Sequence, residues 1–143
     1  MIIKATINEL KPLVELMLKL WPDHQQEELE ADTSLLITTN QFFLLKENNK
    51  YIGFAQCSIR NDYVEGCDTT PVGYLEAIYI EKEYRNKGYA KELVNAAMSW
   101  AKEKGCSQFA SDCEATNIDS IAFHKAIGFE VTNTIVCFKK PIE

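Results

Sequence analysis

Residues 73–80 read GYLEAIYI, and residues 83–90 read EYRNKGYA directly before a long amphipathic segment. The first run has the apolar and aromatic composition of a buried strand, whereas the second is a short basic loop that contains Gly88. A strand that leads through such a loop into a helix points backbone N–H groups at a bound anion. Gly88 lets the backbone approach a diphosphate, and Arg85 and Lys87 add positive charge. The stretch therefore predicts a site for a phosphorylated cofactor; a solvated basic loop is the alternative.

Apolar spacing and turn residues predict the elements on either side of this stretch. Before it, we expect a strand at 2–5, a helix at 7–20, an acidic helix from about 23 to before 40, and strands at 41–47 and 51–60. After it, we expect a helix at 88–104, a strand at 106–113, a helix at 117–127, and strands at 129–132 and 134–139. Thr6 and Glu9 fit a capping box at the first helix, and Asn48 and Asn49 suit a hairpin turn. This order predicts an α/β (α+β) domain.

Length and composition are those of an ordinary globular domain. With 143 residues, 46% apolar and 25% charged, residues 1–143 are expected to form one domain with one core. No apolar run approaches the roughly 20 residues needed to span a bilayer, and the first residues lack the features of a secretory signal, so we expect a cytoplasmic protein without membrane contact. The five cysteines form no CxxC pair or Cys/His cluster, so we expect reduced thiols and no metal.

The excess of acidic over basic residues indicates which kind of partner the protein binds. A formal net charge of −6 argues against a nucleic-acid-binding surface, which needs a surplus of lysine and arginine. Acidic residues concentrate between residues 21 and 39, where no lysine or arginine occurs, and again between 62 and 68. Each run includes an aromatic residue, Trp21 or Tyr63. Charge and aromatic faces together suit recognition of a polycation, and solvated helix and loop surface is the alternative.

A wider set of motifs resembles a known family. The central strand, the loop Arg85-x-x-Gly88-x-Ala90, and the downstream residues Asn117, Ser120, His124 and Gly128-Phe129 resemble the GNAT superfamily of acetyl-CoA-dependent N-acetyltransferases. The blocks SIRNDYVEG (residues 58–66) and FASD (residues 109–112) are similar to those of aminoglycoside 6′-N-acetyltransferases of the short, dimeric type. These two blocks are more specific than the glycine loop, and the likeness covers nearly all of the chain.

This resemblance implies a fold and a cosubstrate. The GNAT fold has a mixed, mostly antiparallel central sheet that is splayed at its middle strands and carries helices on both faces. Acetyl-CoA would lie in the splay, with its diphosphate on the loop and its pantetheine arm along the strand edge, as an added strand would. No metal is implied. The expected cofactor-binding residues are Ile78, Tyr79, Ile80, Arg85, Asn86, Lys87, Gly88, Tyr89, Ala90, Asn117 and Ser120.

The resemblance also implies three catalytic residues, Asp112, Glu76 and His124. An amine of pKa about 10.4 must lose a proton before it attacks, which costs about 4–5 kcal/mol at pH 7. We expect Asp112 to orient the amine and pass its proton on through water, with Glu76 facing the same amine; for both, an acid that caps a strand end or meets a buried backbone group is the alternative. His124 stands where many GNAT enzymes have a tyrosine, and it is either the proton donor to the CoA thiolate or a packing residue. The N–H of Tyr79 or a neighbour would hold the oxyanion.

The acceptor pocket is expected to combine aromatic faces for sugar rings with carboxylates for ammonium groups. Packing of Trp21 in the core is an alternative to its place in the pocket. The expected substrate-binding residues are Trp21, Asp23, Asp62, Tyr63 and Glu65, together with Glu76 and Asp112.

These implications converge on one activity. We expect acetyl transfer from acetyl-CoA to the 6′-amine of an aminoglycoside, by direct attack in a ternary complex, which confers antibiotic resistance. The family also implies a homodimer, with residues 134–139 as an exchange edge. Two alternatives stay open: a GNAT enzyme for another amine, such as a polyamine or a peptide amine, and an acyl-CoA-binding module without catalysis.

Overall fold

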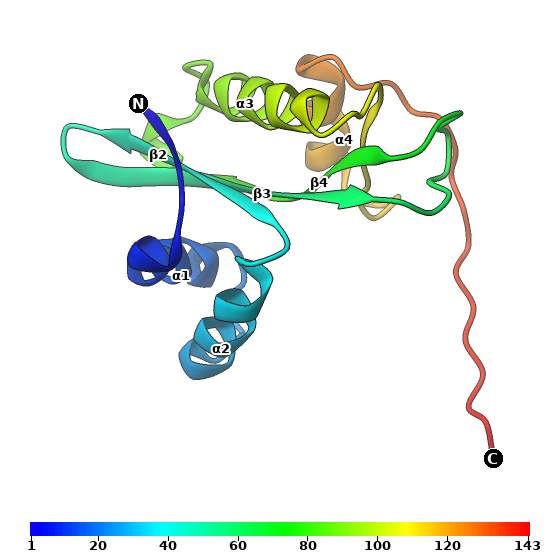
Figure 1. The fold of residues 1–143 in the computed structure, drawn as a ribbon, viewed down its shortest axis with the longest axis horizontal. Helices are drawn as coiled ribbons and strands as arrows, with labels where there is room; N and C mark the ends of the chain where they lie inside the picture. The colour runs from blue at the N-terminus through cyan, green and yellow to red at the C-terminus, as the bar shows by residue number, and fades with distance from the viewer.

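The computed structural model describes all 143 residues, and its centre is one five-stranded sheet (Figure 1). The strands lie side by side in chain order: β1 (Ile2–Lys4), β2 (Gln41–Glu47), β3 (Lys50–Arg60), β4 (Val72–Ile80) and β5 (Phe109–Ser111). Neighbours from β1 to β4 run antiparallel, whereas β5 runs parallel to β4. The predicted mixed, mostly antiparallel sheet is therefore confirmed.

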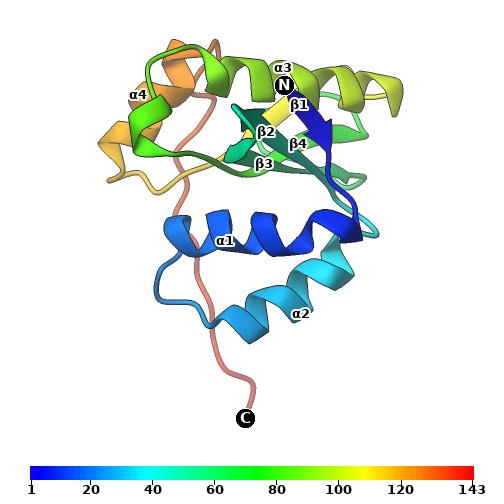
Figure 2. The ribbon, with the colours of Figure 1, turned by 90° about the vertical axis from the view of Figure 1, so that its left-hand side faces the viewer.

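Helices cover both faces of the sheet (Figure 2). One face carries α1 (Leu10–Leu20) and α2 (Gln26–Leu36), and the other carries α3 (Tyr89–Glu103) and α4 (Ile118–Ala126). We call these the α1 face and the α3 face. The predicted capping box is present before α1, where Thr6 N donates to Glu9 Oε1 at 2.8 Å and Asn8 N donates to Thr6 Oγ1 at 3.2 Å. None of the helices combines the length and the hydropathy needed to cross a bilayer.

Alternation along the strands divides the apolar side chains between two cores. The core on the α3 face contains, among others, Phe43, Leu45, Leu75, Leu93 and Trp100. The core on the α1 face contains, among others, Leu13, Met17, Phe42, Leu44 and Phe54. Neighbours in sequence, such as Phe42 and Phe43, therefore lie on opposite sides of the sheet.

The sheet opens between β4 and β5. Their pairing covers only residues 73–75 of β4 and 109–111 of β5. The pairing of β4 with β3 passes over Glu76, because Gln56 pairs with Ala77 and Cys57 pairs with Leu75. Such a bulge bends and twists the strand. From Glu76 onward the edge of β4 that faced β5 has no strand beside it, and this opening is the splay that the family resemblance implied.

The two C-terminal strands predicted at 129–132 and 134–139 are wrong for the single chain. Residues 129–143 form no strand and leave the body as an extended segment (Figure 1). Val136 and Phe138 in this segment are 75% and 91% exposed. The apolar pattern is that of a strand, but a strand also needs a neighbour for its N–H and C=O groups, and these residues pair with none. β5 is shorter than the predicted strand at 106–113 for the same reason, since its pairing with β4 ends at Ser111.

Candidate active site

The predicted site residues fall into two groups, one on each face of the sheet at the opening. The loop before α3 and the polar residues of α4 belong to the α3 face. Glu76 and Asp112 belong to the α1 face, because each is hydrogen-bonded to side chains that point to that face. Consecutive residues of an extended chain point to opposite faces, so Ser111 at the end of β5 and Asp112 directly after it belong to different groups.

The loop at residues 85–90 forms an open backbone cradle at the start of α3. Gly88 is the N-cap of the helix and has φ +86°, a left-handed conformation that favours glycine. A Cβ placed on Gly88 would meet no atom within 4 Å, so the space beside it is free for a ligand. The first N–H groups of α3 and the helix dipole point to this space. The loop therefore fits a diphosphate.

Two cationic side chains of the loop lie over nearby aromatic rings. Arg85 lies 5.5 Å from the centre of the Tyr79 ring, and its Nε donates to Ile80 O at 2.8 Å. Lys87 lies 5.4 Å from the centre of the Tyr84 ring. Both cations are exposed and remain able to face an anion. Asn86 between them has φ +64°, which shapes the turn into Gly88.

The open edge of β4 presents the backbone of Ile78. Glu81 N donates to Ile52 O of β3 at 2.8 Å, and backbone groups of an antiparallel strand alternate between its two sides. Tyr79 therefore points its N–H at β3, whereas Ile78 points its N–H and C=O at the side that β5 has left. The bond from Arg85 to Ile80 O lies on that open side and fits the same alternation. Of the two predicted oxyanion donors, the neighbour Ile78 has the free N–H, and Tyr79 does not.

Polar residues of α4 form a connected group with β5. Asn117 is the N-cap of α4, and its Oδ1 accepts a hydrogen bond from Ser120 N at 3.1 Å. His124 Nδ1 lies 2.7 Å from Ser120 O, and His124 Nε2 lies 2.8 Å from Ser111 Oγ. Ser111 Oγ is also 3.3 Å from Leu75 O. Both ring nitrogens of His124 are therefore engaged inside the chain.

On the α1 face, Arg60 and Tyr74 link the two predicted acids. Arg60 Nη2 lies 3.0 and 3.1 Å from the two carboxylate oxygens of Glu76, and the Ser58 hydroxyl donates to the same carboxylate. The Arg60 guanidinium lies 3.4 Å from the centre of the Tyr74 ring. The Tyr74 hydroxyl in turn donates to Asp112 Oδ2.

These contacts leave Glu76 and Asp112 with different capacities to bind a ligand. Burial, together with the hydrogen bond to Asp112, raises the pKa of Tyr74 above its ordinary value, so the phenol stays a donor. Glu76 is held by Ser58 and Arg60, and its side chain is only 25% exposed. Asp112 is exposed and uses one carboxylate oxygen on Tyr74, which leaves the other for a ligand.

Two of the predicted pocket residues have structural partners. Trp21 is half-buried at the end of α1, with its ring centre 6.5 Å from that of Phe54, so it lies at the margin of the α1-face core. Tyr63 is 73% exposed, and its hydroxyl donates to Glu65 at 3.0 Å. The structure thus brings Tyr63 and Glu65 together and sets Trp21 against the sheet.

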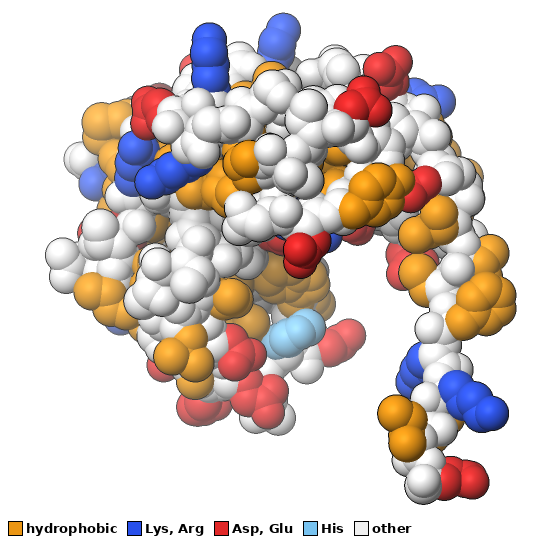
Figure 3. All heavy atoms as spheres, turned by 45° about the vertical axis from the view of Figure 1, so that its right-hand side comes forward, with side chains coloured by type: hydrophobic (Ala, Val, Ile, Leu, Met, Phe, Trp, Pro, Cys, Tyr) orange, Lys and Arg blue, Asp and Glu red, His pale blue; other side chains and the backbone are white.

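The predicted pocket residues do not form a closed pocket with the two acids. None of Trp21, Asp23, Asp62, Tyr63 and Glu65 makes a hydrogen bond to Glu76 or Asp112. Figure 3 shows a gap between the body and the C-terminal segment, with acidic side chains on the body beside it and both basic and acidic side chains on the segment. The arrangement is an open acidic surface that suits a large cation.

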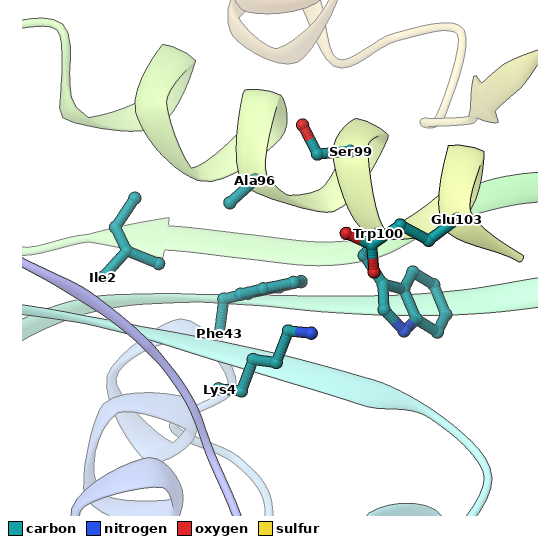
Figure 4. A pocket seen from close by; sticks show the side chains of 7 residues that line it. All are labelled: Ile2, Lys4, Phe43, Ala96, Ser99, Trp100 and Glu103. Atoms are coloured by element: carbon teal, nitrogen blue, oxygen red, sulfur yellow. The ribbon is translucent and has the colours of Figure 1, made fainter.

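A separate hollow lies on the α3 face, between α3 and the edge strand β1 (Figure 4). Its volume is about 260 Å³. Phe43 and Trp100 form its apolar floor, and Lys4 and Glu103 stand at its rim. None of the predicted site residues lines it.

The cysteines take no part in the site. All five are free, and Cys57 and Cys106 are buried. Burial, with the nearby charge of Glu76, raises the pKa of the Cys57 thiol to about 12, so it does not supply a thiolate nucleophile at neutral pH.

Four site residues were missed by sequence reasoning: Ser58, Arg60, Tyr74 and Ser111. Each lies in a block that pointed to the family or in the central strand. Strand alternation at period two would have placed Ser58 and Arg60 on one face of their strand, and Tyr74 and Glu76 on one face of the next. Their contact with the acids depends on strand pairing, which sequence spacing does not specify.

Comparison with known proteins gives consistent matches. The acetyltransferase (GNAT) family matches residues 7–129. The chain is 42% identical over 125 residues to an aminoglycoside N(6′)-acetyltransferase type 1 of Acinetobacter genomosp. 13, with 86% of each protein covered. It superimposes on the aminoglycoside N-acetyltransferase AAC(6′)-Iy in complex with CoA with a TM-score of 0.95 and 35% identity, over 99% of this chain and 95% of the other. AAC(6′)-Iy in complex with the bisubstrate analogue CoA-S-monomethyl-acetylneamine gives a TM-score of 0.94 at 35% identity, over 99% and 98% of the two chains.

Proposed function

Because the chain belongs to the acetyltransferase (GNAT) family, we propose that it transfers the acetyl group of acetyl-CoA to the 6′-amine of an aminoglycoside. The observation that carries this proposal is the match to a relative bound to a bisubstrate analogue, at a TM-score of 0.94. A relative that is 42% identical is named for this reaction, as an aminoglycoside N(6′)-acetyltransferase. An analogue of both substrates in one molecule is consistent with direct attack of the amine on the thioester.

The α3 face would hold the acetyl donor, whose contribution is the activated acetyl group. The loop Arg85-Asn86-Lys87-Gly88-Tyr89-Ala90 is assigned to the diphosphate, since its backbone is open and two cations flank it. The edge residues of β4, with Asn117 and Ser120 of α4, are assigned to the pantetheine arm. The free N–H of Ile78 is assigned to the oxygen of the reacting carbonyl.

The α1 face would hold the amine. Asp112, with one free carboxylate oxygen, is assigned to orient the ammonium group and to pass its proton to water. Glu76 is already hydrogen-bonded to Arg60 and Ser58, so it is assigned to the electrostatics of the site and not to proton removal. Trp21, Asp23, Asp62, Tyr63 and Glu65 are assigned to the outer part of the acceptor, where exposed rings and carboxylates suit sugars and ammonium groups.

The assembly that the C-terminal segment supports is a homodimer. The segment carries exposed apolar residues at Val131, Ile135, Val136, Phe138 and Ile142. The edge of β5 that faces away from β4 has no strand beside it. A second copy supplies a matching edge and a matching segment, so exchange of the two segments would pair the backbone and bury the apolar side chains of both.

The cellular role that follows is resistance to aminoglycosides in the cytoplasm. Acetylation removes the positive charge of the modified amine, on which recognition of a polycation depends. Five free cysteines suit a reducing compartment.

The test is CoA release by the purified protein with matched acceptors. Kanamycin-type aminoglycosides with the 6′-amine are expected to release CoA, and the same compounds with a 6′-hydroxyl are not. Spermidine is tested beside them. Turnover with spermidine alone would favour a GNAT enzyme for another amine. CoA binding without release for any amine would favour a non-catalytic acyl-CoA-binding module.

A further inference from the structure

Ser111 occupies the point at which β4 and β5 separate. It pairs with Leu75, which is the last residue of β4 in the register with β5. Beyond this pair the edge of β4 is open. The Ser111 hydroxyl therefore lies at the closed end of the opening, on the α3 face, which is the face assigned to the acetyl donor.

His124 holds one fixed orientation behind Ser111. Its Nδ1 lies 2.7 Å from Ser120 O, and a carbonyl oxygen only accepts hydrogen bonds. The Ser120 hydroxyl is also near Nδ1 but farther away, at 3.4 Å, so the shorter contact with the carbonyl assigns a proton to Nδ1. The ring is also enclosed by Phe123 and Phe129, whose ring centres lie 5.4 and 5.2 Å away at steep angles. Nε2 has Ser111 Oγ as its partner, at 2.8 Å.

This geometry allows two proton arrangements. When the ring is neutral, Nε2 has a lone pair and Ser111 Oγ–H donates to it. When the ring is protonated, Nε2–H donates to Ser111 Oγ, and the serine hydroxyl is free to donate elsewhere. Leu75 O, 3.3 Å away, is the acceptor that the chain itself offers. Ser111 Oγ is the group of the chain that is hydrogen-bonded to Nε2, and it lies at the opening, so it links Nε2 to the acetyl donor.

We propose that Ser111 delivers the proton to the CoA thiolate and that His124 supplies it from behind, so that the direct donor is a serine hydroxyl. This inference rests on the proposed function. It assigns Ser111 as a catalytic residue and His124 as its proton source, a group that does not itself reach the sulfur.

The step balances in atoms and charge. The C–S bond breaks and leaves its electron pair on sulfur. The Ser111 O–H bond breaks as the S–H bond forms, and Ser111 Oγ takes the proton from His124 Nε2. The products are the CoA thiol, an intact serine and a neutral imidazole with its proton on Nδ1. The imidazole regains a proton on Nε2 from water.

The first test reads the ring directly in the protein without ligand. The chain has two histidines, so a His24→Asn variant identifies the signals of His124. Long-range ¹H–¹⁵N spectra of the neutral ring are expected to show the proton on Nδ1 of His124. In Ser111→Ala the ¹⁵N chemical shift of Nε2 is expected to change, because its hydrogen-bond partner is lost. In Ser111→Thr, which keeps the hydroxyl, this chemical shift is expected to stay near that of wild type. A proton on Nε2 in the neutral ring would overturn the proposal.

The second test uses single-turnover rates with two acetyl donors. Ser111→Ala is expected to lower the rate with acetyl-CoA about 100-fold, the lower end of what a positioned acid contributes, while CoA affinity changes less than about threefold. With the acetyl ester of the selenol analogue of CoA, the loss is expected to shrink to within about threefold, because a selenolate leaves without a proton. Ser111→Thr is the matched control and keeps most of the activity with both donors.

The pair of residues adds a third comparison. His124→Gln is expected to lose as much as Ser111→Ala, and the double variant no more than either, because both belong to one relay. If Ser111→Ala lowered the rate equally with acetyl-CoA and with the selenol analogue, the relay would be overturned. The proposed function would still stand, because wild type would still acetylate the aminoglycoside. If wild type modified no amine, the proposed function would fail, and the spectra of the free protein would still decide the arrangement of Ser111 and His124.

Discussion

Replacing Gly88 by alanine separates the conformational role of this residue from its role in ligand binding. Gly88 is the N-cap of α3 with φ +86°, and a Cβ there would meet no atom of the chain within 4 Å. Alanine therefore clashes with nothing and adds only the strain of a left-handed backbone, about 1–2 kcal/mol in the free energy of unfolding. This strain is the same with and without ligand, so alone it leaves affinity unchanged.

A bound diphosphate adds a second effect. The new methyl group occupies the free space beside the loop and keeps the phosphate from the backbone N–H groups. Loss of one hydrogen bond to a charged group costs about 1.5–3 kcal/mol, which corresponds to a rise of about 10- to 150-fold in the Kd for CoA. Gly88→Val should raise the Kd further, because its side chain is larger.

Gly105 offers a matched control at the other end of α3. It has φ +91°, and a Cβ placed on it would also meet no atom of the chain within 4 Å. Gly105→Ala should lose the same stability as Gly88→Ala in urea unfolding and should bind CoA like wild type in calorimetry. If Gly88→Ala also bound CoA with wild-type affinity, the loop would not be the diphosphate site, and the assignment of the α3 face would be wrong.

Three further outcomes are expected. Asp112→Ala should lower kcat for an aminoglycoside far more than it weakens CoA binding in calorimetry, and equal loss of both would contradict its role. Burial raises the pKa of Glu81, but the hydrogen bonds from Lys19 and Tyr79 outweigh it and hold the pKa below its ordinary value. The ionised carboxylate therefore stabilises the fold above pH about 4.3, and this stability is lost as the pH falls through the folded-state pKa. Lys19→Met should therefore cost about 1–2 kcal/mol at pH 7 in urea unfolding and progressively less below pH about 4, whereas a constant loss would refute the link. If the chain forms the proposed dimer, Phe138→Asp should shift its sedimentation to that of a monomer; a monomeric wild type would refute the dimer, and an unchanged dimer in the variant would show that the C-terminal segment is not its interface.

Much of the fold followed from local patterns. The turn at Asn48 and Asn49 was predictable because both residues tolerate a positive φ, and the structure gives them φ of +50° and +62°. The capping box at Thr6 and Glu9 was predictable because both partners lie within one helical turn. Signals of this kind depend on a few consecutive residues, so they survive without knowledge of the rest of the chain.

Features that depend on pairing were less predictable. The C-terminal strands failed because their apolar pattern says nothing about whether a neighbour is present. The bulge at Glu76 also left no signal in the sequence, yet it decides that Ile78 and not Tyr79 offers its N–H to the opening. Among the site residues, Arg60 and Tyr74 became visible only once β3, β4 and β5 lay side by side.

The amino-acid order alone determined the strand, the loop with Gly88 and the helix that follows, and with them the expectation of a phosphate-binding turn. Only the folded chain decided which polar side chains meet across the opening, such as Tyr74 with Asp112 and Ser111 with His124. The physical reason is distance along the chain. Backbone conformation responds to near neighbours, whereas a contact such as that between residues 74 and 112 requires the register of β4 and β5, which the packing of the whole sheet selects.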